Sequence, residues 1–102
     1  MDRVVRGKNV AVVISPEYGA GWYSWSNDIT MLFDPGLVGL VEEGDEGKIH
    51  TYVSLKWAGE YLEGSERGLE VWWVPLGKKF RIHDYDGAET IEMMDQIDWI
   101  TA

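Results

Sequence analysis

An uninterrupted apolar run near the N-terminus constrains the fold more than any other feature of the sequence. Residues 10–14 are Val-Ala-Val-Val-Ile, and Gly7 and Pro16 bound the run. Because β-branched residues favour strands and no polar residue alternates with the apolar ones, the run predicts a strand that is buried on both faces. This strand therefore belongs to the interior of the fold, and Pro16 ends it.

The middle of the chain carries helix signals. In Phe33-Asp34-Pro35-Gly36, Asp34 is expected to cap a helix and Pro35 to occupy its first position, where a missing N–H costs nothing. That helix should stop at Gly44, and either Asn27 or Asp28 can cap another short helix before it. Residues 48–62 fit both helical spacing and alternation, and their length favours a helix.

Beyond residue 68 the pattern predicts strands. Residues 69–74 and 79–85 alternate, and Asp86-Gly87 is a typical hairpin turn after which residues 89–93 return antiparallel. Residues 98–100 are expected to add a short terminal strand. The sequence therefore predicts a single α+β domain over residues 1–102: an N-terminal strand, a helical middle and a C-terminal antiparallel β-meander, forming one sheet with helices on one face.

The charge is strongly negative, and it limits the partners. Eighteen acidic against nine basic residues give a formal net charge of −9, which argues against direct binding to nucleic acid or to anionic membranes. The basic residues gather in two clusters, the first of Arg3, Arg6 and Lys8, the second of Lys78, Lys79 and Arg81. After residue 81 only acidic charges follow. With no cysteine and no long apolar segment, the chain is expected in a reducing cytoplasm.

Catalytic and cofactor patterns are weak. His50 and His83 have neither a nucleophile nor a third orienting group near them in the sequence, so no enzyme and no cofactor is predicted. Asp84, Asp86 and Glu89 resemble the start of an oxygen-ligand loop, but the turn already explains Asp-Gly, and no metal is predicted. The glycine pair in Tyr-Gly-Ala-Gly-Trp lacks the remaining residues of a phosphate-binding loop.

An aromatic and glycine-rich loop follows the first strand. Tryptophan occurs six times in 102 residues, and two of the six stand in this loop. The rings either close the end of the core or form an exposed anchor for a partner. On the second interpretation the partner-binding residues are Tyr18, Gly19, Gly21, Trp22 and Trp25 in the loop, with Asp84, Asp86, Glu89, Glu92 and Asp95 as an acidic face.

Three motifs in order, VVISPEYGAGW, FDPGLVGLVEE and EVWWVPLGKKFRIHDYDGAETI, resemble a family of small acidic proteins of unknown function from bacteriophages and prophages. They span about half of the chain. Ala20 and Trp22 stand where that family has Gly and Phe, and His83-Asp84 where it has two acids. The loop is also similar to one in some small anti-CRISPR proteins. The resemblance implies a phage setting and an α+β fold, and it supplies no catalytic residues.

These observations favour a phage accessory protein that binds a host protein with a basic surface stoichiometrically, in the host cytoplasm, as a monomer or homodimer. A counter-defence or host-takeover inhibitor whose acidic face mimics nucleic acid is the most concrete version. One alternative is a nucleotide-binding sponge that uses the glycine loop, with Arg3, Arg6 or Lys8 on the phosphate. Another is a virion or assembly component.

Overall fold

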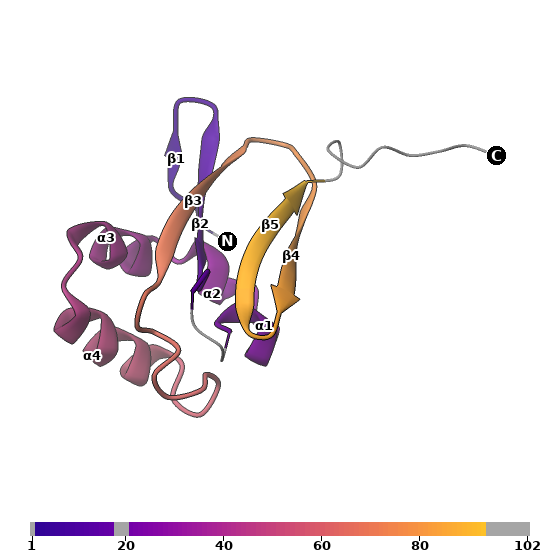
Figure 1. Cartoon of the computed structure of the whole chain (residues 1–102). Coiled ribbons are helices and arrows are strands. Elements are labelled where there is room, and N and C mark those ends of the chain that lie inside the picture. Colours follow the sequence, from indigo (N-terminus) through magenta and orange to yellow (C-terminus); the bar gives the residue numbers. More distant parts are fainter. Residues whose placement is uncertain (1, 18–20, 94–102) are drawn as a thin grey trace.

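The computed structural model of the chain describes residues 2–17 and 21–93 (Figure 1). It is a mixed α+β fold with a helical middle and C-terminal strands, as predicted. The elements in chain order are β1 (Val5–Arg6), β2 (Asn9–Ile14), α1 (Tyr23–Ser26), α2 (Thr30–Phe33), α3 (Pro35–Glu43), α4 (Glu46–Lys56), β3 (Glu70–Pro75), β4 (Phe80–Tyr85) and β5 (Ala88–Met93). The terminal strand expected at 98–100 lies outside the described residues.

The strands form two sheets, which corrects the expectation of one. The first sheet has the order β1-β2-β3 and the second is the β4-β5 hairpin, and every pairing is antiparallel. β3 pairs with the N-terminal strand, with Val12 opposite Trp72, and not with β4. The turn after Pro75 sends the chain out of the first sheet, so that the hairpin packs its apolar side against one face of that sheet.

Three layers result from this arrangement. Figure 1 shows the β1-β2-β3 sheet between α3 and α4 on one side and the β4-β5 hairpin on the other. On the helix side, Ala11 and Val13 of β2 share a core with α3 and α4. On the hairpin side, the alternate residues of β2 pack with Phe80, Ile82 and Ile91. Both faces of β2 are therefore buried, as its uniform apolar sequence predicts.

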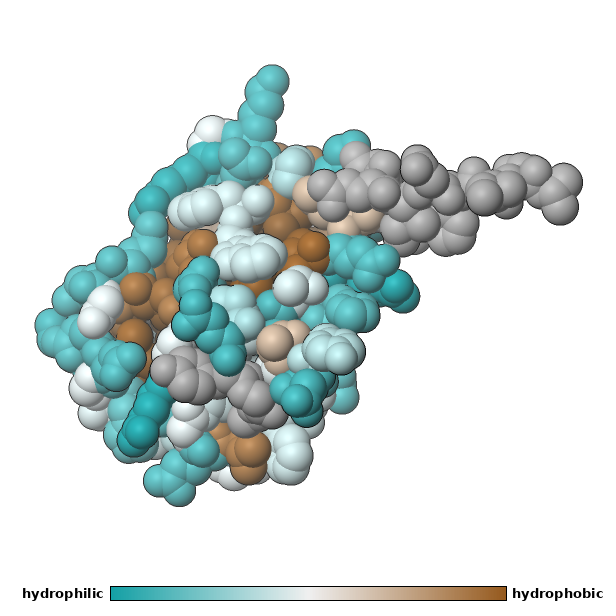
Figure 2. All heavy atoms as spheres, in the orientation of Figure 1, coloured by the Kyte–Doolittle hydropathy of each residue, from teal (hydrophilic) through white to brown (hydrophobic). Residues whose placement is uncertain are grey.

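β3 divides its side chains between the two faces of the sheet, in agreement with the alternation of residues 69–74. Val71 and Trp73 pack toward the helices, whereas Trp72 and Val74 pack toward the hairpin. β3 is also the edge of the sheet that faces the viewer in Figure 1, and Figure 2 shows apolar side chains in a band over it and toward α3, with hydrophilic side chains around them. Alternation along a strand thus decides which core each side chain joins.

The predicted caps and turn are present. The carboxylate of Asp34 accepts a hydrogen bond from the Leu37 N–H at 2.9 Å, and Pro35 opens α3. Gly44 ends that helix in the left-handed conformation with φ of 78°. Residues 46–56 are helical, so the helix expected over residues 48–62 is present only as far as Lys56, and residues 57–62 lie in a loop of bends and turns instead. Asp86 and Gly87 both have positive φ, as a tight two-residue hairpin turn requires.

Candidate functional site

The end of the glycine loop is held by a buried carboxylate. Glu89 of β5 has no exposed surface. Its Oε1 accepts a hydrogen bond from the Ser15 N–H at 2.9 Å, and its Oε2 accepts from the N–H and the Oγ of Ser24, both at 2.8 Å. The Glu89 N–H in turn donates to the Ser15 carbonyl. One side chain therefore joins the end of β2, the start of α1 and the hairpin.

Gly21 stands at the closest approach of these segments. Its φ is 75°, and a Cβ added there would lie 2.4 Å from Ser24 Oγ and 3.6 Å from the Gly87 carbonyl oxygen. A side chain at this position would clash as well as strain the backbone. The glycine thus lets the loop lie against the hairpin turn and against Glu89, rather than leaving the loop free to bend.

Three of the predicted partner-binding residues, Gly21, Trp22 and Glu89, are buried, which corrects the expectation that they are exposed to a partner. Trp22 is fully buried, its indole N–H donates to the Met31 carbonyl at 2.9 Å, and its ring packs edge-on against Trp57 at 5.7 Å between centroids. It closes the core, which was the other interpretation of the loop. Glu89 is used inside the fold. Tyr18, Gly19 and Asp95 lie outside the described residues.

An exposed surface is formed where α1 meets the hairpin turn. We call Trp25, Asp84, Tyr85 and Asp86 the tip surface. Trp25 is 57% exposed and Tyr85 is 79% exposed, and both aspartates are also exposed. Trp25 follows Ser24, which is bonded to Glu89, and Glu89 pairs across the hairpin with Asp84. The structure therefore holds the segment that carries Trp25 of the predicted loop against the hairpin that carries Asp84 and Asp86 of the predicted acidic face.

The described carboxylates do not form one continuous acidic face, contrary to expectation. Glu92 is paired with Arg81, which donates to it from Nε and from an Nη at 3.1 Å each. Its charge is thereby largely compensated. Only Asp84 and Asp86 of the predicted set are both described and exposed without that compensation, so the acidic contribution of the hairpin is local to its tip.

Tyr85 was missed by sequence reasoning, although a signal for it existed. It lies between two acids next to a hairpin turn, and alternation along the strand places its side chain on the face of β4 that does not carry the core residue Ile82. An aromatic ring on the solvent face at the end of an acidic hairpin is an exposed anchor by position alone.

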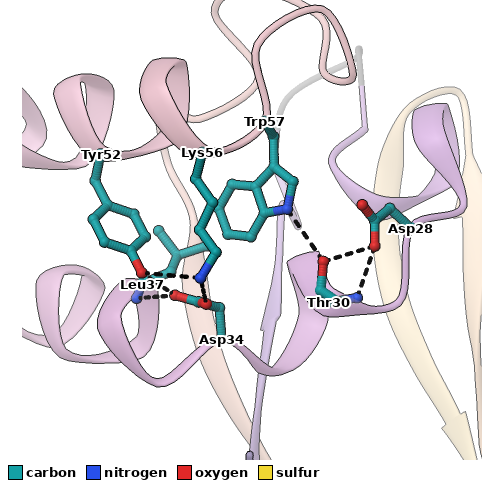
Figure 3. Close-up of polar contacts among 7 residues, drawn as sticks. All are labelled: Asp28, Thr30, Asp34, Leu37, Tyr52, Lys56 and Trp57. Carbon is teal, nitrogen blue, oxygen red and sulfur yellow. Dashed lines mark hydrogen bonds and ion pairs between the residues drawn. The ribbon is translucent and has the colours of Figure 1, made fainter. Parts of the chain in front are cut away.

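A polar cluster joins α3 to α4 (Figure 3). Asp34 bonds to the Tyr52 hydroxyl at 2.5 Å and to Lys56 Nζ as well as to the Leu37 N–H. Burial alone would raise the pKa of Asp34, but these hydrogen bonds outweigh it and lower the pKa. Burial and the bond to Asp34 raise the pKa of Tyr52. An ionised acid and a neutral phenol locked together in this way hold two helices in place rather than present a reactive group.

A histidine–glutamate pair lines a polar hollow between α4 and the loop after it. His50 Nδ1 lies 3.0 Å from Glu66 Oε1, and Glu66 is buried and also accepts from the Gly64 N–H. Such a carboxylate can orient an imidazole. The adjacent hydroxyl of Ser65 is buried, so it is not presented to a substrate. His83 is exposed on β4.

The described residues contain no group of His, Cys, Asp or Glu side chains that could hold a metal ion. Among the same residues, no helix is long and apolar enough to cross a bilayer. Comparisons with protein-family models, with curated proteins and with solved structures found no match to the chain. The geometry of the chain itself therefore has to carry any functional argument.

Proposed function

We propose that the chain is a protein-binding module that docks through the tip surface onto a partner with a basic surface. The observation that carries this proposal is the exposure of two large rings, Trp25 on α1 and Tyr85 on β4, and of two carboxylates at the end of the same hairpin. Tryptophan and tyrosine dominate binding energy where a partner covers them, and nearby acids favour a basic partner over an acidic one.

The free energy gained by covering the two exposed rings is sufficient for a stable contact with a partner. Covering the exposed part of one indole contributes on the order of 2–4 kcal/mol, and the Tyr85 ring adds a comparable amount. Glu89 fixes α1 against the hairpin before a partner arrives, which reduces the entropy that binding would otherwise cost. The exposed rings are therefore presented by a site that is already formed.

The biological setting extends the same proposal. The three motifs that resemble small acidic phage proteins support a stoichiometric inhibitor of a host protein in the host cytoplasm, in counter-defence or host takeover. Nucleic-acid mimicry has less support, because the described acids of the hairpin do not form a continuous face and Glu92 is paired with Arg81.

A matched pair of double variants tests the docking site. Trp25→Ser with Tyr85→Ser removes both rings of the tip surface, whereas Leu55→Ser with Leu76→Ser removes two exposed leucines elsewhere. A protein captured from bacterial host lysate at about 150 mM salt is identified by mass spectrometry, purified and titrated calorimetrically with each version of the chain.

We expect saturation at a fixed ratio of the two proteins, a loss of at least about 30-fold in affinity for the tip variant, and near wild-type affinity for the control. About 30-fold corresponds to roughly 2 kcal/mol, the lower end of what one covered indole supplies. Equal affinity of the tip variant and the wild type, or no protein retained in a manner that depends on the tip, would overturn the proposal.

A further inference from the structure

A second, chemically different site lies between the N-terminus, α2 and β4. It is an open pocket of about 630 Å³, within the range of small-ligand sites. Its walls come from segments far apart in the sequence: Arg3, Tyr23, Ile29, Leu32, Phe33, Lys78, Lys79, Phe80, Arg81 and Ile82. None of the four tip-surface residues lines it, so its occupancy can be tested separately from partner docking.

The charge of the pocket is opposite to that of the protein. Four of its lining residues are cations and none is an acid, although acidic residues outnumber basic ones by 18 to 9 in the chain. Arg3 comes from the first basic cluster of the sequence and the other three cations come from the second. Arg6, also of the first cluster, instead bonds to Glu42 and lies over Trp73. The fold thus gathers positive charge at one hollow.

The floor of the pocket is aromatic. The Phe33 and Phe80 rings meet edge to face, with 6.1 Å between centroids and 79° between planes. The Arg3 guanidinium lies 4.4 Å from the centre of the Phe33 ring, a contact that does not use its N–H groups, so these can donate to an oxyanion. Lys79 is exposed and makes no ion pair with any described residue, whereas Arg81 is held by Glu92.

Two backbone donors that flank the glycine loop, the other candidate place for an anion, are already used within the chain. The N–H groups of Ser15 and Ser24 donate to the Glu89 carboxylate. A phosphate at that position would have to compete with the Glu89 side chain for these two donors. The two described donors therefore give the nucleotide alternative no support, whereas Arg3, which was also assigned to the phosphate, lines the basic pocket.

We infer that the basic pocket binds an aromatic phosphate, the chemical class to which free nucleotides belong. The flat ring lies on the apolar floor around Phe80, and the phosphate meets Arg3 and Lys79. A bidentate contact from the guanidinium and a point charge from the ammonium are the usual partners of a phosphate. The net charge of −9 disfavours a nucleic-acid polymer at this site, because the rest of a polymer would run over an acidic surface.

The test uses the full chain and four probes in calorimetric titrations: 1-naphthyl phosphate, AMP, inorganic phosphate and 1-naphthol. We expect the two aromatic phosphates to bind at least 10-fold more tightly than either fragment. Binding of naphthyl phosphate without binding of AMP would indicate that the natural ligand is an aromatic phosphate other than a nucleotide. This outcome would still support the site.

Variants locate the binding. Lys79→Gln and Arg3→Gln should each weaken naphthyl phosphate binding about 10-fold, whereas Lys48→Gln, which alters an exposed lysine on α4, should not. Circular dichroism confirms that each variant is folded. No saturable binding of either aromatic phosphate, equal binding of inorganic phosphate, or binding that survives in both pocket variants would overturn the inference. The Trp25 and Tyr85 double variant should bind both aromatic phosphates normally.

Discussion

Replacing Glu89 by alanine should destabilise the fold far more than replacing Glu92 on the same strand. Glu89 is fully buried and accepts three hydrogen bonds, from the Ser15 N–H and from the N–H and Oγ of Ser24. Alanine leaves these donors without their acceptor in the interior. With roughly 1–3 kcal/mol for each unsatisfied buried group, and some relief from water entering near Ser24, the expected loss is about 3–5 kcal/mol.

Urea unfolding followed by tryptophan fluorescence measures this loss directly. For a domain of this size each kcal/mol shifts the melting temperature by about 4–8 °C, so thermal unfolding should show a large fall as well. Glu92→Ala is the matched control, because it removes only a surface pair with Arg81 that is worth up to about 1 kcal/mol. Glu89→Gln should fall between the two, since its amide nitrogen must face an N–H donor wherever it is placed.

A difference of less than about 1 kcal/mol between Glu89→Ala and Glu92→Ala would refute the reasoning. It would mean that the carboxylate does not hold the loop to the hairpin, and that α1 keeps its place by apolar packing alone. The preorganisation argued for the tip surface would then have no physical basis, although the exposed rings themselves would remain.

Two further perturbations have clear signs. Gly21→Ala should cost about 1–3 kcal/mol in thermal unfolding, because φ of 75° strains alanine and its Cβ would meet Ser24 Oγ at 2.4 Å; Gly39→Ala, at an open helical position, is the control and should be neutral or stabilising. The pKa of Asp34 is lowered in the fold, so its contribution is present above its unfolded pKa and is lost as pH falls from about 4 through the folded pKa. Acid titration of stability should therefore be less steep in Asp34→Asn, and an unchanged slope would contradict the assigned bonds.

The sequence predicts those features that depend on neighbouring residues. Asp34 and Pro35 satisfy the start of a helix by their own chemistry, and Asp86-Gly87 adopts the positive φ values that a tight hairpin needs. The apolar run of β2 likewise contains its own evidence of burial on both faces. These local rules hold because no distant segment has to be known in order to apply them.

Strand pairing was not predictable in the same way. The alternation of residues 69–74 shows a strand with two different faces, but it is equally compatible with pairing to residues 79–85 or to the N-terminal strand. β3 pairs with β2 because β2 needs a neighbour along its length and apolar cover on both faces. The hairpin supplies the second cover only by leaving the sheet, and this competition between distant segments is not written in any local pattern.

Glu89 and Trp22 differ in whether their burial could be predicted from the sequence. Glu89 shares its strand face with Ile91 and Met93, both packed against the core, so alternation alone places this acid on the buried side. The acidic residues around Glu89 instead led to its assignment to an exposed, partner-binding face. No comparable signal exists for Trp22, because its burial depends on the Met31 carbonyl and the Trp57 ring, which come from other elements.

The buried carboxylate of Glu89 supports the tip surface but does not line the basic pocket. Backbone N–H groups near glycines can attract anions, and in this chain the Glu89 carboxylate accepts from two of them, those of Ser15 and Ser24 on either side of the glycine loop. These bonds have an ordering role, since Glu89 holds Ser24 of α1, the helix that carries the exposed Trp25. An external anion needs positively charged groups at another place. The described basic residues provide them in the pocket that Arg3 lines together with the first residues of β4. Partner docking and anion binding should therefore respond to different substitutions, with Glu89→Ala weakening the first while Lys79→Gln weakens only the second.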